Sequence, residues 1–122
     1  MDPTFIFRFH LSKCLYAKIR GQFRLGHYLR ASGSPAVMVL SHLLRQYFAL
    51  SLLKPEHMKP EMDRIEDELK TQTLAFCTAD DRKRFMLFHH YVIKTWMIGH
   101  GPEQISVFGA KFKTNNVIER LD

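Results

Sequence analysis

Acidic residues are almost absent from the first half of this chain of 122 residues. Residues 1–53 contain seven Lys and Arg side chains and a single acid, Asp2, so they carry a net charge of +6. The remainder has eleven basic and eleven acidic residues and is neutral. Because Lys and Arg displace counterions from phosphates, the excess favours a polyanionic partner, most simply DNA. A solvated basic face without a partner is the alternative.

Cysteines and long apolar runs are also scarce. The two cysteines, Cys14 and Cys77, belong to no CxxC or CxxxH motif, so the sequence predicts neither a zinc site nor a disulfide framework. A reducing compartment is then the expected environment. No stretch approaches the roughly 20 apolar residues of a membrane span, and the N-terminus lacks the apolar run of a signal peptide. We therefore expect a soluble intracellular protein with no membrane partner, nuclear if it acts on DNA.

Local catalytic motifs are missing as well. The sequence contains no glycine-rich phosphate loop, no GxSxG elbow and no HExxH pair. Of the seven histidines only His89 and His90 are adjacent. Consecutive helical positions point about 100° apart, so these two would not easily share a metal. We expect a core or boundary role for this pair and a core role for Trp96.

The apolar spacing is mostly helical. Leu11, Cys14, Leu15 and Ile19 lie at the i, i+3, i+4 and i+8 positions of one helical side. A second helix is predicted from Pro35, with Ser34 as its N-cap, to about Leu50. Its buried side should comprise the following residues: Val37, Leu40, Leu44, Tyr47 and Phe48.

Two further helices are predicted in the second half. One should start at Pro60, because a proline in a helix interior costs about 3 kcal/mol. It would bury Met62, Ile65 and Leu69 and expose an acidic side: Asp63, Glu66, Asp67 and Glu68. Thr78 should cap another helix over 79–98. Residues 85–98 are apolar on most of the circumference, which indicates burial on more sides than so short a chain supplies. This favours a missing segment or a homo-oligomer.

Residues 5–9 are aromatic and β-branched and predict a short buried strand, and residues 105–108 a second extended segment. At the C-terminus, 113–122 predicts a turn that opens a helix, with Thr114 or Asn116 as N-cap. Only about six residues of that helix would precede the end of the sequence, and such short helices are unstable alone. We therefore expect a truncated fold that is mainly α, with about five helices and one or two short strands.

One known family resembles this chain. The run Tyr91–Gly99, followed by Phe108 and by Lys113–Glu119, is similar to the C-terminal signature of Mutator-like (MULE) transposases. In that family a "Y…W…G" helix precedes an Arg/Lys-Thr-Asn-Asn-x-x-Glu motif. Weaker similarity, over Phe9-His10, Leu15–Ile19 and Leu50–Glu56, extends to the family's Cys-x-x-His element and to the helical segment after that element. The resemblance covers nearly the whole chain in order, and Thr114–Glu119 is its most specific part.

The resemblance implies an RNase H-like domain that is interrupted by a helical insertion before its last catalytic helix. In such transposases three acids hold two Mg²⁺ ions, which activate the attacking and leaving oxygens of DNA cleavage and strand transfer. Glu119 matches the third acid and would bind metal in an intact homologue. Thr114, Asn115 and Asn116 match the rest of that motif, and His10 matches the histidine of the earlier element. Residues 1–122 would then be one partial domain, with the insertion over about 10–100 and the start of the final helix over about 114–122.

Departures from the family pattern count against activity. Phe7 occupies the cysteine position three residues before His10, and Asp2 is the sole aspartate before Asp63. One carboxylate cannot assemble a two-metal site, so we expect no catalysis and no metal cofactor in this chain alone. Without the resemblance, Glu119 would be interpreted as the N3 residue of a capping box that starts at Asn116.

Two other interpretations stay open. The chain could be a helical DNA-binding or protein-interaction module that uses its basic N-terminal half: Lys13, Lys18, Arg20 and Arg24. It could also be a translated fragment without function, which would show poor solubility and molten behaviour of its apolar helix.

Overall fold

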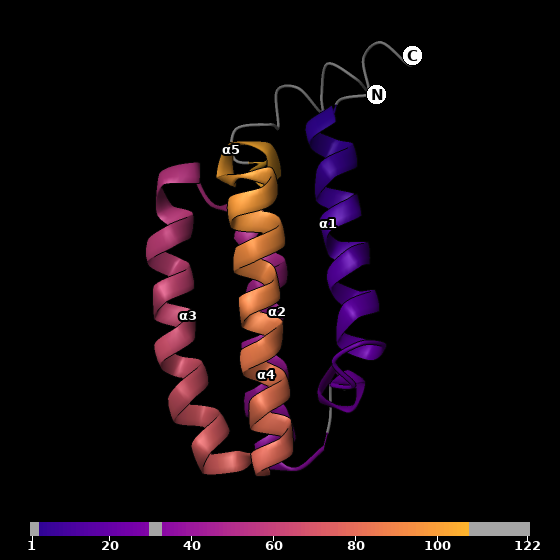
Figure 1. The fold of residues 1–122 in the computed structure, drawn as a ribbon, viewed down its shortest axis with the longest axis vertical. Helices are drawn as coiled ribbons and strands as arrows, with labels where there is room; N and C mark the ends of the chain where they lie inside the picture. The colour runs from indigo at the N-terminus through magenta and orange to yellow at the C-terminus, as the bar shows by residue number, and fades with distance from the viewer. Residues whose placement is uncertain (1–2, 30–32, 108–122) are drawn as a thin grey trace.

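The long helices lie side by side, as a computed structural model shows for residues 3–29 and 33–107, with side chains described from Leu11 onward (Figure 1). Within these residues there are five α-helices and no strand. The α-helices are α1 (Pro3–Arg20), α2 (Pro35–Ala49), α3 (Pro55–Phe76), α4 (Ala79–Tyr91) and the short α5 (Pro102–Ile105). Two 3-10 turns, η1 (Gly26–Leu29) and η2 (Leu50–Leu52), and a π-helix, η3 (Val92–His100), complete the order.

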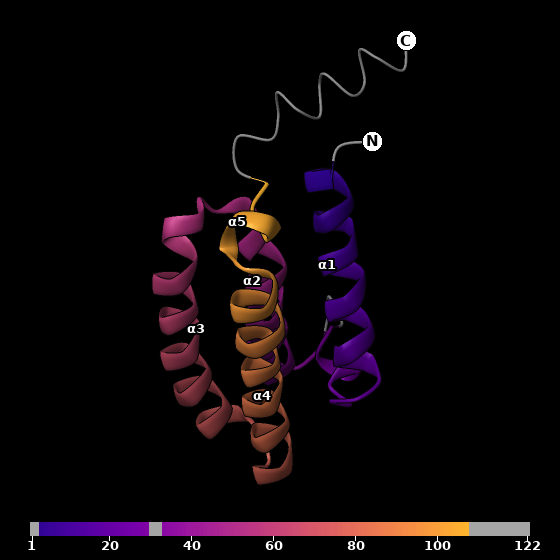
Figure 2. The same cartoon turned by 45° about the horizontal axis from the view of Figure 1, so that its top comes forward.

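Helices α2 and α4 form the centre of the bundle, and α1 and α3 flank them on opposite sides (Figures 1 and 2). Helix α3 packs against both α2 and α4. Helix α5 closes one end of the bundle, where it contacts α1, α3 and η3. None of the helices in the described residues is long and apolar enough to cross a membrane.

Helix α1 corrects one prediction and confirms another. Residues 5–9 are helical and not a strand. A lone strand would leave its N–H and C=O groups unpaired, and the described residues offer no second strand, whereas a helix pairs these groups internally. Further along, Leu11, Leu15 and Ile19 are buried and Cys14 is half-buried, as the spacing predicted.

Helix α2 has the predicted cap. The Ser34 hydroxyl accepts a hydrogen bond from the Val37 N–H at 3.3 Å, and Pro35 occupies the first helical position. The buried side comprises Leu40, Leu44 and Tyr47, with Val37 and Phe48 half-buried; Leu43 is also buried, which was not predicted.

Helix α3 starts five residues earlier than predicted. Pro55 provides a first helical position and Pro60 lies inside the helix. Pro60 has no N–H for the Glu56 carbonyl, but Glu56 is exposed and water can reach that carbonyl. The prediction of a start at Pro60 is therefore wrong. The buried side is as expected: Met62, Ile65 and Leu69, joined by Met58.

Helix α4 and η3 form one continuous rod from Ala79 to His100. The Thr78 hydroxyl accepts a hydrogen bond from the Asp81 N–H at 3.2 Å, which confirms the predicted cap. The last nine residues wind as a π-helix. Gly101 ends the rod with φ +92°, a backbone conformation that favours glycine.

The π-helical winding brings positions five residues apart into contact. The Trp96 indole N–H donates to the Tyr91 hydroxyl at 3.0 Å, and the Gly101 N–H bonds to the Trp96 carbonyl at 2.9 Å. The Trp96 ring also stacks on His100, with ring centroids 4.6 Å apart. Trp96 itself is buried, so its expected core role is confirmed.

The segment predicted to be extended over 105–108 begins instead as helix α5. Ser106 is extended, and Phe108 lies outside the described residues. Ser106 donates from its hydroxyl to the Leu53 carbonyl at 2.5 Å, and the Val107 N–H donates to the Ser51 carbonyl at 2.7 Å. These bonds join the end of the described chain to the connection between α2 and α3.

The apolar rod 85–98 is only partly covered. Its inward side, with Phe85, Phe88 and Val92, is buried in the core. Its outward side leaves Leu87 50% exposed and Ile98 76% exposed. The bundle therefore covers one side of this rod well, but not its whole apolar circumference.

Candidate nucleic-acid interface

The outer side of α1 carries two of the four basic residues predicted to bind nucleic acid. Lys13 and Arg20 are both exposed and lie seven residues apart, which is about two helical turns, so they share one side. The Arg20 guanidinium lies over the ring of Tyr16, 5.5 Å from its centroid. These two cations are therefore aligned along the edge of the bundle.

The other two predicted residues point elsewhere. Lys18 is half-buried on the side of α1 that faces α4, where its Nζ donates to the Gln22 amide oxygen at 2.8 Å. The same Nζ lies 5.4 Å from the ring centroid of Tyr91. Arg24 is exposed in the turn after α1, with φ +53°. The four residues therefore do not form a single patch, and Lys18 also helps to hold α1 against α4.

Helix α4 and η3 contribute basic residues that were not predicted. Lys83 and Lys94 are exposed and eleven residues apart, on the side of the rod that points away from the core. No acid occurs from Arg82 to Pro102, nor from Pro3 to Lys54. Counting charge over the whole second half did not reveal these basic residues, because that half is neutral. It combines eight acids and three bases over residues 55–81 with four bases over residues 82–102.

Aromatic contacts make α1 and α4 neighbours. Phe23, just after α1, packs edge-on against Phe88 with ring centroids 5.6 Å apart, and against Tyr91 at 5.8 Å. Together with the Lys18–Tyr91 contact, these rings hold the two acid-free segments side by side. We call the surface of these two segments, with Lys13, Lys18, Arg20, Lys83 and Lys94, the basic side, although its cations point in more than one direction.

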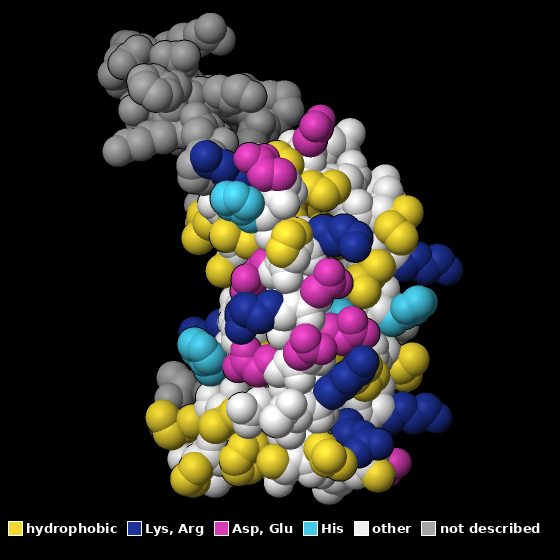
Figure 3. All heavy atoms as spheres, turned by 90° about the vertical axis from the view of Figure 1, so that its left-hand side faces the viewer, with side chains coloured by type: hydrophobic (Ala, Val, Ile, Leu, Met, Phe, Trp, Pro, Cys, Tyr) yellow, Lys and Arg dark blue, Asp and Glu magenta, His cyan; other side chains and the backbone are white. Residues whose placement is uncertain are grey.

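Six of the nine acids in the described residues lie on the opposite flank, along α3. Figure 3 shows them interspersed with Lys and Arg. Asp63 and Asp67 are exposed as predicted, whereas Glu66 and Glu68 are half-buried. Lys59 and Lys70 pair with Asp63 and Glu66 at 4.0 and 3.9 Å.

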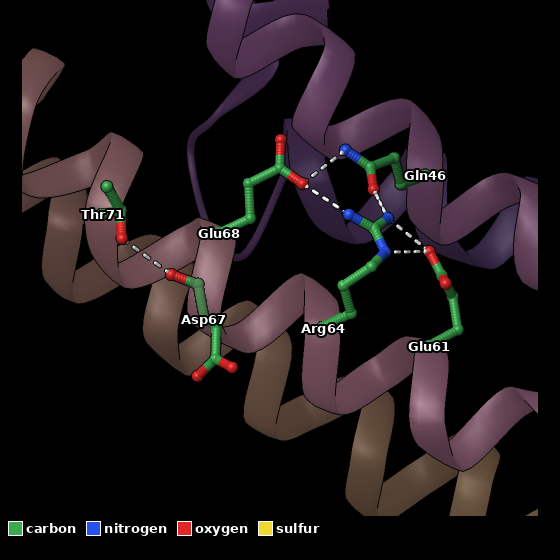
Figure 4. Close-up of polar contacts among 6 residues, drawn as sticks. All are labelled: Gln46, Glu61, Arg64, Asp67, Glu68 and Thr71. Atoms are coloured by element: carbon green, nitrogen blue, oxygen red, sulfur yellow. Dashed lines mark hydrogen bonds and ion pairs between the residues drawn. The ribbon is translucent and has the colours of Figure 1, made fainter.

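Arg64 pairs with two further acids of α3, Glu61 and Glu68 (Figure 4). It forms hydrogen bonds with Glu61 on one side and with Glu68 on the other, the latter at 2.8 Å, and it reaches Gln46 on α2. The bonds to Glu61 and Glu68 raise the pKa of Arg64. Since these carboxylates already have a cationic partner, they stabilise the contact between α2 and α3 and are poorly placed to hold a metal.

A second polar cluster connects η1 with the start of α4. Asp81 accepts hydrogen bonds from the Tyr28 hydroxyl at 2.5 Å and from Arg84 at 2.8 Å, and His27 lies 3.5 Å away. Burial, together with the bond to Asp81, raises the pKa of Tyr28. Burial likewise raises the pKa of the nearby Cys77 thiol, so this thiol stays protonated and is a weak nucleophile. The cluster fastens the turn after α1 to α4.

His89 lies in the core, which is one of the two roles, core or boundary, predicted for it. Only 2% of it is exposed, and its Nδ1 lies 2.8 Å from the hydroxyl of the buried Tyr47. Its Nε2 is buried and has no hydrogen-bond partner within the described part of the chain. His90 is exposed.

The residues of the transposase-like motif cannot be placed. Thr114, Asn115, Asn116 and Glu119 lie outside the described residues, and for His10 only the backbone, in α1, is described. Within the described part of the chain, no group of three or more His, Cys, Asp or Glu residues could hold a metal ion. Comparisons with protein families, with curated proteins and with solved structures gave no match for this chain.

Proposed function

We propose that this chain is a DNA-binding helical module, equivalent to the helical insertion of a Mutator-like transposase domain, that has no catalytic activity by itself. The observation that carries the binding proposal is the separation of charge. The two segments that make up the basic side contain no acid, whereas α3 on the opposite flank carries half of the acids of the chain. A polyanion approaching the basic side meets five cations, and the nearest acids along α4 are Asp80 and Asp81 in its first turn.

Affinity should come from phosphate contacts and should therefore depend on salt. Each phosphate neutralised by a Lys or Arg adds about 0.9 to the slope of log affinity against log salt concentration. We expect a short fluorescein-labelled DNA duplex to bind with a slope of about −3 to −4, if three or four of the basic side chains engage at once. Fluorescence anisotropy between about 50 and 200 mM salt measures this slope.

Matched double variants separate the basic side from net charge. Lys13→Gln with Lys94→Gln should weaken binding and reduce the slope by about two. Lys59→Gln with Lys70→Gln removes the same charge from exposed lysines of α3 and should leave the slope unchanged. Equal weakening by both pairs would show that net charge alone attracts DNA. No binding at the lowest salt concentration would end the proposal.

The transposase part of the proposal has separate tests. We expect no nicking of supercoiled plasmid DNA in Mg²⁺, because a two-metal site needs several converging carboxylates. Nicking that depends on metal and disappears in Glu119→Gln would contradict this. The resemblance itself predicts that coding sequence upstream encodes strands with two aspartates and that downstream sequence extends the helix of Glu119. Flanking sequence with neither feature would remove the transposase interpretation and leave DNA binding unaffected.

A further inference from the structure

A groove runs between α1 and α2, on a side of α1 that faces away from α4. Its volume is about 460 Å³, within the size range of ligand sites in proteins. Its walls come from three parts of the chain: Ser12 and Tyr16 of α1, Leu29 of η1, and Arg45, Phe48 and Leu52 of α2 and η2.

The groove presents apolar surface to solvent. Tyr16 is 47% exposed and Leu52 is 50% exposed, whereas Leu29 and Phe48 are half-buried and pack against the core. Two leucines and two aromatic rings thus form its apolar surface, and the Phe48 ring packs against the core from behind. Such a trough between two helices accepts the apolar side chains of a third helix, spaced i, i+3, i+4 and i+7.

The rim of the groove is cationic. Arg45 lies in its wall and donates through Nε to the Ser41 hydroxyl at 3.4 Å, which uses one of the five guanidinium donors. Arg20 lies over the Tyr16 ring at the opposite wall. All the lining residues belong to the stretch from Pro3 to Lys54, which contains no acid. Carboxylates flanking an apolar helix face would therefore meet cations on both walls.

We propose that this groove binds an amphipathic acidic helix of a partner protein. The same cations could meet the phosphates of single-stranded nucleic acid, but base stacking needs open aromatic faces. Here Arg20 already lies over Tyr16, and Phe48 is half-buried against the core. Leu29 and Leu52 provide apolar surface without a ring to stack on, which favours side chains over bases. The groove shares Arg20 with the basic side, but Arg45 and Leu52 lie outside that side, so variants of these two residues test the groove independently of the proposed DNA binding.

A fluorescein-labelled synthetic helix tests the proposal, with leucines at the i, i+3, i+4 and i+7 positions and glutamates elsewhere. Fluorescence anisotropy should show saturable binding, weaker for a scrambled peptide and for a version with lysines in place of the glutamates. Leu52→Asp should weaken the affinity by about tenfold or more. Leu74→Asp, at a leucine of α3 that is 68% exposed, is the matched control and should leave the affinity within about twofold.

Arg45→Glu shows whether weaker peptide binding reflects a change in the groove or a loss of folding. It should weaken the glutamate peptide and strengthen the lysine peptide, a reversal that a misfolded protein would not give. Lys94→Gln should leave peptide binding unchanged, so failure here is distinguishable from failure of DNA binding.

Several results would overturn the proposal. No saturable binding up to about 1 mM peptide would do so, as would equal losses in Leu52→Asp and Leu74→Asp. Binding of a labelled oligo(dT) that is lost in Leu52→Asp would reassign the groove to nucleic acid. A dimer in sedimentation that dissociates in Leu52→Asp would assign it to a second copy of this chain.

Discussion

The buried pair of Tyr47 and His89 gives a quantitative prediction for stability. The Tyr47 hydroxyl and His89 Nδ1 are 2.8 Å apart, and Nε2 of His89 has no partner among the described residues. A buried polar atom without a partner costs about 1–3 kcal/mol. Tyr47→Phe leaves His89 with a second such atom and should destabilise the protein by about that amount.

The other two variants of the cycle should behave differently. His89→Leu leaves the Tyr47 hydroxyl unpaired but removes the unpaired Nε2, so its net cost should be small. The double variant Tyr47→Phe/His89→Leu has no buried polar atom at this place and should be at least as stable as the wild type. Urea unfolding followed by circular dichroism gives the free energies of unfolding. If the double variant loses as much stability as the two single losses combined, the two residues are not coupled and the reasoning fails.

The same histidine should make stability depend on pH. Burial lowers the pKa of His89, although Glu66 on α3 partly opposes this. The unfolded chain then binds the proton more readily, so stability is complete above the ordinary histidine pKa of about 6.5. As the pH falls below that value, the wild type should lose up to about 1.4 kcal/mol per pH unit until the folded-state pKa is reached. Equal loss in His89→Leu and the wild type between pH of about 7.5 and 5.5 would refute this assignment.

Two further predictions concern the helices. Pro60→Ala should stabilise the protein by about 1–3 kcal/mol, because alanine restores the N–H for the Glu56 carbonyl and removes the clash of the proline ring. The greater entropy of the unfolded chain opposes this by about 0.4–1 kcal/mol. An unchanged or lower urea midpoint would contradict the placement of Pro60 inside α3. Thr78→Ala should cost about 1 kcal/mol and lower Tm by a few degrees, because it removes the acceptor for the Asp81 N–H, and Thr78→Ser should retain most of the stability.

Local rules predicted the starts of two helices and the buried side of a third. Ser34 and Thr78 were identifiable as caps because a cap depends on only three or four neighbouring residues. The stripe of Leu11, Leu15 and Ile19 was identifiable because burial on one side imposes a helical period.

Other features depend on contacts that the sequence does not display. Residues 5–9 have high β-propensity, but without a partner strand that preference cannot be satisfied. Pro60 is accommodated because the helix has already started at Pro55 and the carbonyl that loses its donor is at the surface. The π-helical winding of η3 accompanies the bonds of Trp96 to Tyr91 and Gly101, and the spacing of the apolar residues does not indicate it.

Only some residues of the candidate interface could be predicted from the sequence. Charge counting found Lys13 and Arg20, but it could not show that Lys18 turns toward Tyr91. Lys94 was missed because the acids of α3 conceal the basic residues of α4 when charge is averaged over half of the chain. Glu119, the most specific residue of the transposase resemblance, stays a prediction.

The placement of α1 and α3 on opposite flanks gives the molecule a permanent electric dipole across its width. In dilute buffer, where the screening length exceeds about 10 Å, copies should repel one another despite this dipole, because each carries a net charge of +6. The same dipole should orient the protein on a cation-exchange surface, so that α1 faces the resin and α3 stays in solution.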